Sequence, residues 1–205
     1  MTGRRAAGKR YDRSYFDRWY RSREKVVTPE DTTIKARFAL AAAEYMLGRR
    51  VQSVLDVGCG EGEWRAVLRR ARPQLRYTGV DSSEYTVKRY GRRRGIRHGS
   101  FGDVGTMGLR GRFDLVICAN VIQYVETREL RRGLRAIRRL TRGLAFLEAF
   151  AAEDDVEGDQ DGWIVRPADV LRNEFHRAGF IACGMHCWMP RENRWRAAVL
   201  EVAEN

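Results

Sequence analysis

From residue 51 onward, short apolar runs alternate with longer amphipathic stretches, and this alternation restricts the chain to few folds. Strands are predicted at 51–57 (VQSVLDV), 75–81 (LRYTGVD), 96–101 (IRHGSF), 113–120 (FDLVICAN) and 143–150 (GLAFLEAF). Helices are predicted at 62–71, 83–94, 127–141 and 167–178. Strands that alternate with helices in this way form a mostly parallel, doubly wound α/β sheet.

Two further apolar runs, 180–188 (FIACGMHCW) and 195–202 (WRAAVLEV), predict a closing pair of strands. Their connection through Pro190 and Asn193 is short, so we expect an antiparallel hairpin at one edge of the sheet. The sequence has no internal repeat or linker, and 205 residues suffice for one core. We therefore expect a single domain, 1–205, made of a helical lid (1–48) and a core (49–205).

The predicted lid contains two helical patterns. Residues 11–20 (YDRSYFDRWY) predict an amphipathic helix with an aromatic face. A second helix is predicted from Pro29 to Gly48, with Thr28 as its N-cap. Its apolar face is predicted to consist of Ile34, Phe38, Ala41, Ala42, Tyr45 and Met46.

The net charge of +12 and a pI of about 10.1 raise the possibility of a nucleic-acid partner. However, only four of the 39 basic residues are lysines, and the arginines are spread along the chain, as GC-rich codon usage alone produces. The sequence therefore favours a small-molecule partner, and nucleic acid remains the alternative. It predicts no oligomeric state.

The apolar runs, the first residues and the cysteines of the sequence predict its localisation and metal content. No apolar run is long enough to span a membrane, and the segment MTGRRAAGKRYDR lacks the apolar stretch of a secretory signal. The chain does not need disulfides, so we expect a reduced, cytoplasmic setting for its four cysteines. Cys183, His186 and Cys187 match no zinc-site spacing, so we expect no metal.

Three glycines, Gly58, Gly60 and Gly62, follow the first predicted strand directly. A dinucleotide-binding G-x-G-x-x-G motif requires its third glycine at position 63, where this chain has glutamate. Asp56, at the end of that strand, would repel a pyrophosphate and suits a ligand with a positive end. Asp81, at the end of the next strand, is placed to accept hydrogen bonds from ribose hydroxyls.

The segment DVGCGEG (56–62) matches the D/E-x-G-x-G-x-G motif of class I S-adenosylmethionine-dependent methyltransferases, which the chain resembles over about residues 51–202. FGDV (101–104) and FDLVICANVIQYV (113–125) strengthen the resemblance. It implies the seven-stranded, Rossmann-like methyltransferase fold with an antiparallel last strand. It also implies S-adenosyl-L-methionine as cofactor.

The resemblance further implies roles for individual residues. Asp56 corresponds to the acid that orients the ammonium group of the cofactor, and Asp81 to the acid that binds the ribose. The helix that starts near Gly62 is expected to offer its first amides to the carboxylate of the cofactor. The predicted cofactor-binding set is Asp56, Gly58, Cys59, Gly60, Gly62, Asp81, Ser82, Asp103, Val104 and Asn120, with Asp103 and the backbone of Val104 at the adenine and Asn120 near the sulfonium.

The sequence identifies no catalytic base. A sulfonium-bound methyl group is already electrophilic, so orienting the acceptor is the main requirement. Many small-molecule members of the family have histidines after the fourth strand, where this chain has Gln123 and Tyr124. Tyr124, Gln123 and Tyr15 are the candidates for contact with the acceptor.

The reaction predicted from these residues is methyl transfer to a small molecule by in-line displacement. Methylation or binding of RNA, and a non-catalytic cofactor-binding subunit, are the alternatives.

The segment from Glu148 to Asp161 has seven acidic residues and no basic one. It follows the fifth predicted strand at its carboxyl end, where such sheets bind ligands. We expect it to border the pocket and to attract an amine-bearing acceptor. The alternative is that it pairs with Arg18 and Arg21 of the first helix.

Overall fold

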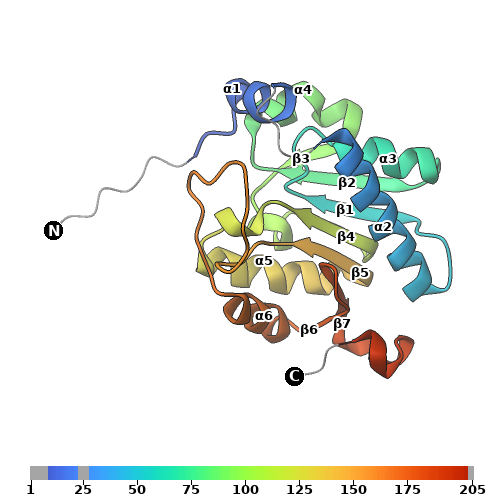
Figure 1. The fold of residues 1–205 in the computed structure, drawn as a ribbon. Coiled ribbons are helices and arrows are strands. Elements are labelled where there is room, and N and C mark those ends of the chain that lie inside the picture. Colours follow the sequence, from blue (N-terminus) through green and yellow to red (C-terminus); the bar gives the residue numbers. More distant parts are fainter. Residues whose placement is uncertain (1–8, 23–27, 203–205) are drawn as a thin grey trace.

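The computed structural model describes residues 9–22 and 28–202, and within them one seven-stranded sheet forms the centre of the molecule (Figure 1). Residues 1–8 and 23–27 of the predicted lid lie outside the described residues. The strand order is β3-β2-β1-β4-β5-β7-β6. The strands are β1 (Ser53–Val57), β2 (Arg76–Asp81), β3 (Ile96–His98), β4 (Phe113–Ala119), β5 (Thr141–Glu148), β6 (Phe180–Ala182) and β7 (Cys187–Pro190).

Helices cover both faces of the sheet (Figure 1). They are α1 (Arg13–Phe16), which continues as a π-helical turn (Asp17–Arg21), α2 (Pro29–Leu47), α3 (Glu63–Ala71), α4 (Glu84–Arg94), α5 (Thr127–Leu140) and α6 (Ala168–Arg177). α2 and α3 pack on one face through residues such as Leu40 and Leu68. α5 and α6 pack on the other face through Leu134 and Phe175. The predicted α/β sheet is therefore confirmed.

The order of the strands reverses between β1 and β4, which lie side by side and parallel. β1 leads outward through β2 to β3, and β4 leads the other way to β5. At such a switch point the connections leave in opposite directions and open a crevice at the carboxyl ends of the strands. The glycine loop after β1 and the residues after β2 and β4 meet at this crevice.

The last hairpin differs from the prediction. β6 and β7 pair antiparallel with each other across a tight turn at 183–186, inside a single apolar run, and β7 also pairs antiparallel with β5. The predicted strand at 195–202 is wrong, because this stretch contains short 3₁₀ turns and exposes Trp195 and Leu200. The turn places Met185 and His186 in the left-handed region, which the sequence does not signal.

α2 begins as predicted but buries a different face. The Thr28 hydroxyl accepts from the backbone N–H of Asp31 at 3.1 Å, and the Asp31 carboxylate accepts from the backbone N–H of Thr28 at 2.9 Å. The predicted apolar face is wrong in part: Met46 is buried and Phe38 and Ala42 pack against the core, but Ile34 and Tyr45 are 60% and 70% exposed. Small side chains allow this helix to approach the sheet closely. The buried stripe consists of Thr32, Ala36, Ala39, Leu40, Ala43 and Met46.

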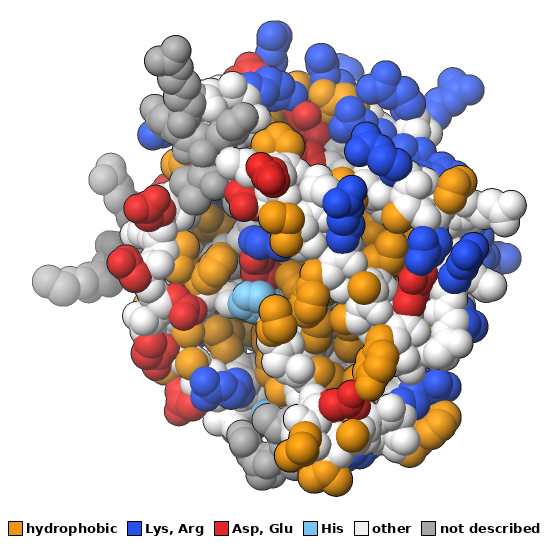
Figure 2. Space-filling model, turned by 45° about the vertical axis from the view of Figure 1, so that its right-hand side comes forward, with side chains coloured by type: hydrophobic (Ala, Val, Ile, Leu, Met, Phe, Trp, Pro, Cys, Tyr) orange, Lys and Arg blue, Asp and Glu red, His pale blue; other side chains and the backbone are white. Residues whose placement is uncertain are grey.

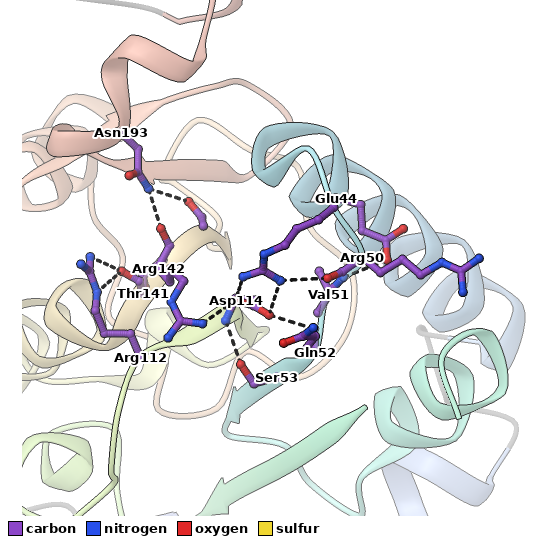
Figure 3. A network of polar contacts seen from close by, with 12 residues as sticks. Glu44, Arg50, Val51, Gln52, Ser53, Arg112, Asp114, Thr141, Arg142 and Asn193 are labelled. Carbon is purple, nitrogen blue, oxygen red and sulfur yellow. Dashed lines mark hydrogen bonds and ion pairs between the residues drawn. The ribbon is translucent and has the colours of Figure 1, made fainter. Parts of the chain in front are cut away.

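A polar network joins the strands at the opposite end of the sheet from the crevice (Figure 3). The fully buried Asp114, near the start of β4, accepts hydrogen bonds from Arg49 at 2.7 and 3.1 Å and from Arg142 at 3.0 Å. The backbone N–H of Gln52 also donates to it at 2.8 Å. The two guanidinium groups hold the pKa of the Asp114 carboxyl below its usual value. This end of the sheet is therefore structural.

The described residues include no helix that is long and apolar enough to cross a membrane. All four cysteines are free thiols. The His186 ring packs edge-on against Phe146 and Phe150. In ranges 9–22 and 28–202, no three His, Cys, Asp or Glu side chains are grouped to hold a metal ion.

Candidate functional site

A cavity of about 510 Å³ lies at the carboxyl ends of β1, β2 and β4. It is lined by the glycine loop, by the aromatic N-terminal segment, by the first turns of α2 and by the loop after β5. Of the predicted site residues, those that line it are Asp56, Gly58, Cys59, Gly60, Asp81, Ser82, Asn120, Gln123, Tyr124 and Tyr15.

The glycine loop presents bare backbone to this cavity. The backbone N–H groups of Gly58 and Cys59 both donate to Val80 O, at 2.7 and 3.1 Å, and fix the loop to β2. Gly58 and Gly60 have φ values of +72° and +52°, which favour glycine. A Cβ on Gly58 would lie 2.2 Å from Val121, and one on Gly60 would lie 2.7 Å from the Tyr20 hydroxyl. A side chain at Gly58 or Gly60 would therefore require Val121 or Tyr20 to move.

Asp56 lies at the base of the cavity and is 2% exposed. The Tyr77 hydroxyl donates to its carboxylate at 2.7 Å. Burial, with a contribution from the nearby Asp81 carboxylate, raises the pKa of Asp56 to about 7, and the Tyr77 hydrogen bond opposes this shift. A positively charged group in the cavity would favour the ionised form of Asp56.

Asp81 connects the glycine loop to the end of β2. Its carboxylate accepts from the backbone N–H of Gly60 at 2.7 Å and from that of Ser83 at 2.8 Å. Burial raises the pKa of Asp81, and these two hydrogen bonds oppose the shift. Each carboxylate oxygen keeps a lone pair that can accept a further hydrogen bond from a ligand hydroxyl.

Three predicted residues lie outside the cavity lining formed by the described residues: Gly62, Asp103 and Val104. The Asp103 carboxylate accepts from the backbone N–H of Ser100 at 3.0 Å and is half exposed beside Arg132. The Val104 side chain is buried in the core. The contact of Asp103 and of the Val104 backbone with the adenine therefore stays a prediction.

The aromatic face of the N-terminal segment covers the glycine loop, and we call this face the aromatic roof (Tyr11, Tyr15, Phe16, Trp19 and Tyr20). The rings of Tyr11, Tyr15, Phe16 and Tyr20 contact one another in that order, and Phe16 stacks on Tyr85 of α4 at 5.7 Å between ring centroids. The Ser83 hydroxyl donates to the backbone oxygen of Tyr11 at 2.5 Å. Arg21 pairs with Glu61 at 2.5 Å. Both ends of the roof are thus fixed to the loops after β1 and β2.

A family model described as "Methyltransferase domain" matches residues 30–201 of the chain. The chain belongs to this family. It is a class I S-adenosylmethionine-dependent methyltransferase, and its strand order, with the antiparallel β7, is that of the Rossmann-like methyltransferase fold. No curated protein matches the chain.

Solved structures share the fold at low sequence identity. A SAM-dependent methyltransferase from Archaeoglobus fulgidus is 14% identical with a TM-score of 0.62, over 82% of this chain and 73% of that one. Magnesium protoporphyrin IX methyltransferase (ChlM) from Synechocystis PCC 6803, solved with bound SAH, is 19% identical with a TM-score of 0.57, over 84% and 87%. DesVI from Streptomyces venezuelae is 15% identical with a TM-score of 0.59, over 78% and 92%.

Tyr20 and Lys35 are among the residues of the methyltransferase cavity that sequence reasoning missed. Tyr20 was assigned only to the aromatic face, yet its hydroxyl lies directly over Gly60. Lys35 of α2 lines the cavity, and its ammonium group pairs with Glu148 at 2.5 Å. Glu148 is 2% exposed, and its Oε2 has no hydrogen-bond partner among the described residues. The sequence signal that could have found Lys35 is the stripe of small residues that begins at Thr32. Lys35 is three residues after Thr32 and therefore lies on the same side of the helix.

The acidic loop lies where the sequence predicted, because Asp155, Glu157 and Asp159 line the cavity. In Figure 1 this loop, in orange, rises beside the N-terminal segment. Its partner there is Lys9, whose ammonium group pairs with the Asp159 carboxylate. Arg21, the alternative partner, pairs with residues outside this loop.

Gln123 and Tyr124 are held against the acidic loop. The Tyr124 hydroxyl donates to Asp159 O at 2.5 Å, and the backbone N–H of Ile164 donates to Gln123 O at 2.7 Å. Gln123 Oε1 and Trp163 Nε1 are buried and have no hydrogen-bond partner among the described residues. Both residues line the cavity, but these two atoms are buried within the protein and do not face its open space.

Proposed function

We propose that this methyltransferase acts on a small-molecule acceptor that lies between the aromatic roof and the loop at 150–163. The observation that supports this most is that one cavity is lined by the glycine loop, by the aromatic roof and by residues of the loop after β5. The aromatic roof and the loop at 150–163 lie outside the common core of the fold, so they are suited to select the acceptor. We also propose that residues 1–48 act as the lid over residues 49–205.

The cavity fits S-adenosylmethionine. Bare backbone at Gly58 and Gly60 lets a ligand approach closely, and Asp81 supplies acceptors for two ribose hydroxyls. Asp56 suits the ammonium group of the cofactor, and the Tyr20 hydroxyl beside Gly60 would serve as a donor to its carboxylate. When bound, the cofactor supplies a methyl group that is activated by the positive charge on sulfur.

The protein then mainly has to orient the acceptor toward this methyl group. The roof and the loop at 150–163 hold the acceptor. Gln123 and Trp163 line the part of the cavity proposed for it. Asn120 lines the cavity in the left-handed conformation (φ +59°), and it would close the pocket near the sulfonium of the bound cofactor.

The distribution of charge supports a small acceptor over a nucleic acid. Figure 2 shows Lys and Arg side chains over the top and right of one face, and Asp and Glu along its left edge. Three acidic residues of the loop after β5 line the cavity, and a phosphate backbone would be repelled there. Nucleic acid therefore remains the weaker alternative.

The proposed cofactor site is tested by calorimetry with S-adenosylmethionine and S-adenosylhomocysteine. Asp81→Asn should weaken both about 10- to 100-fold, because it replaces charged hydrogen bonds worth about 1.5–3 kcal/mol. Asp169→Asn is the matched control, since Asp169 is exposed on α6 and is not part of the cavity lining, and it should change affinity less than about threefold. Equal losses in the two variants would contradict the proposed site.

A further inference from the structure

The ammonium group of Lys9 lies among aromatic rings, in a group of side chains that we call the cation cage (Tyr11, Tyr15, Tyr124 and Asp159). Its Nζ is 4.2 Å from the ring centroid of Tyr124, 5.5 Å from that of Tyr15 and 5.8 Å from that of Tyr11. It pairs with the Asp159 carboxylate and donates to Asp161 O at 2.8 Å. The side chains of Lys9 and Asp159 are only 13% and 11% exposed.

The aromatic rings and the Asp159 carboxylate together favour the binding of a positively charged group. An aromatic face attracts a cation within about 6 Å of its centroid, more strongly where water is excluded. A surface ion pair between Lys9 and Asp159 would need no aromatic rings, and it would contribute little to stability. Three ring contacts and a shielded carboxylate therefore form a binding site for an ammonium group.

The cation cage opens into the methyltransferase cavity. All four residues of the cage line that cavity: Tyr11, Tyr15, Tyr124 and Asp159. Lys9 itself is not part of the cavity lining. Tyr11 is also fixed to Ser83, two residues after Asp81, through its backbone oxygen. The cage therefore belongs to the same space as the proposed cofactor site.

We propose that the cation cage is the acceptor subsite, that it takes a primary or secondary aliphatic amine, and that Lys9 occupies it until the acceptor displaces it. This inference rests on the proposed function. The amine enters as an ammonium ion and loses one proton to water. Its lone pair then forms a bond to the methyl carbon, while the bond between that carbon and sulfur breaks and its electron pair stays on sulfur. The methylated ammonium product carries the positive charge that sulfur loses.

The test measures binding of n-butylammonium to Lys9→Gln, in which the competing ammonium is removed. Lys88→Gln, on the exposed face of α4, is the matched control. Saturation-transfer NMR and calorimetry should show binding on the order of tenfold tighter to Lys9→Gln than to the wild type or the control. The neutral isostere 1-butanol should not gain affinity.

A second variant identifies the cage as the cause. Adding Tyr124→Leu to Lys9→Gln should reverse the gain, while thermal unfolding shows that the protein remains folded. The inference is overturned if Lys9→Gln and wild type bind n-butylammonium equally, if 1-butanol gains equally, or if Tyr124→Leu has no effect. Calorimetry with S-adenosylhomocysteine on the same proteins separates the claims. Intact cofactor binding without any amine effect contradicts the cation cage alone, whereas loss of cofactor binding in wild type contradicts the proposed function.

Discussion

Replacing Asp56 with asparagine should change how the stability of the methyltransferase depends on pH. The carboxyl of Asp56 is 2% exposed, and burial raises its pKa to about 7 from an ordinary value of 3.8. The folded protein therefore binds a proton at Asp56 between these two pH values, while the unfolded chain has lost it. Asparagine keeps the shape and can still accept the hydrogen bond from the Tyr77 hydroxyl, but it does not titrate.

The size of the effect follows from the two pKa values. Because the pKa is raised in the folded state, the stability that Asp56 contributes is fully present only below pH 3.8 and falls as the pH rises from there through 7. The part of this interval from pH 5 to the folded pKa is two pH units, each worth about 1.36 kcal/mol, which gives about 2.7 kcal/mol. At pH 8 the folded protein holds a buried carboxylate, which the variant lacks.

Urea unfolding of wild type and Asp56→Asn at pH 5, 6, 7 and 8 measures this effect. The free energy of unfolding of wild type minus that of the variant should fall by about 2.7 kcal/mol between pH 5 and pH 8. Titrating groups that the two proteins share largely cancel in this difference. A difference that is constant within about 0.5 kcal/mol would refute the raised pKa. Saturating S-adenosylhomocysteine should reduce the fall, because its ammonium group favours the charged Asp56.

Three further substitutions test other parts of the structure. Tyr77→Phe removes a hydrogen bond that lowers the pKa of Asp56, so the same urea series should show the transition at a higher pH than in wild type. Asp114→Asn leaves two arginines facing a neutral amide and should lower the free energy of unfolding by about 2 kcal/mol, with the affinity for S-adenosylhomocysteine unchanged by calorimetry. Lys35→Met leaves Glu148 buried without its partner and should cost about 2 kcal/mol in urea unfolding, whereas an unchanged midpoint would show that the pair is not formed in solution.

The parts of the site that the sequence predicted are those fixed by the ends of strands. Asp56, Asp81 and Asn120 end or follow three parallel strands, and parallel strands bring their carboxyl ends to one edge of the sheet. The acidic loop follows β5, which is also parallel to its neighbour β4, so its place beside the cavity could be predicted in the same way. None of these inferences required knowledge of how the helices pack.

The parts that the sequence did not predict depend on packing and on turn geometry. The buried face of α2 is set by small residues that allow close approach, whereas the bulky Ile34 and Tyr45 point outward. The hairpin turn at 183–186 uses left-handed Met185 and His186, where glycine or asparagine would be the usual signal. The contact of Tyr20 with Gly60 joins residues far apart in the sequence. It becomes visible only once the roof is folded over the sheet.

Binding of S-adenosylhomocysteine to two alanine variants tests most directly whether the glycine loop holds the cofactor. Gly60 and Gly48 both have left-handed backbone, at φ +52° and +64°, so alanine at either position costs about 1 kcal/mol of stability. At Gly60 the new Cβ lies in the cavity beside the Tyr20 hydroxyl, whereas at Gly48 it meets no described atom within 4 Å. Calorimetry should show affinity lowered at least about tenfold in Gly60→Ala and unchanged in Gly48→Ala. Equal affinities in the two variants, with both folded, would contradict the cofactor site.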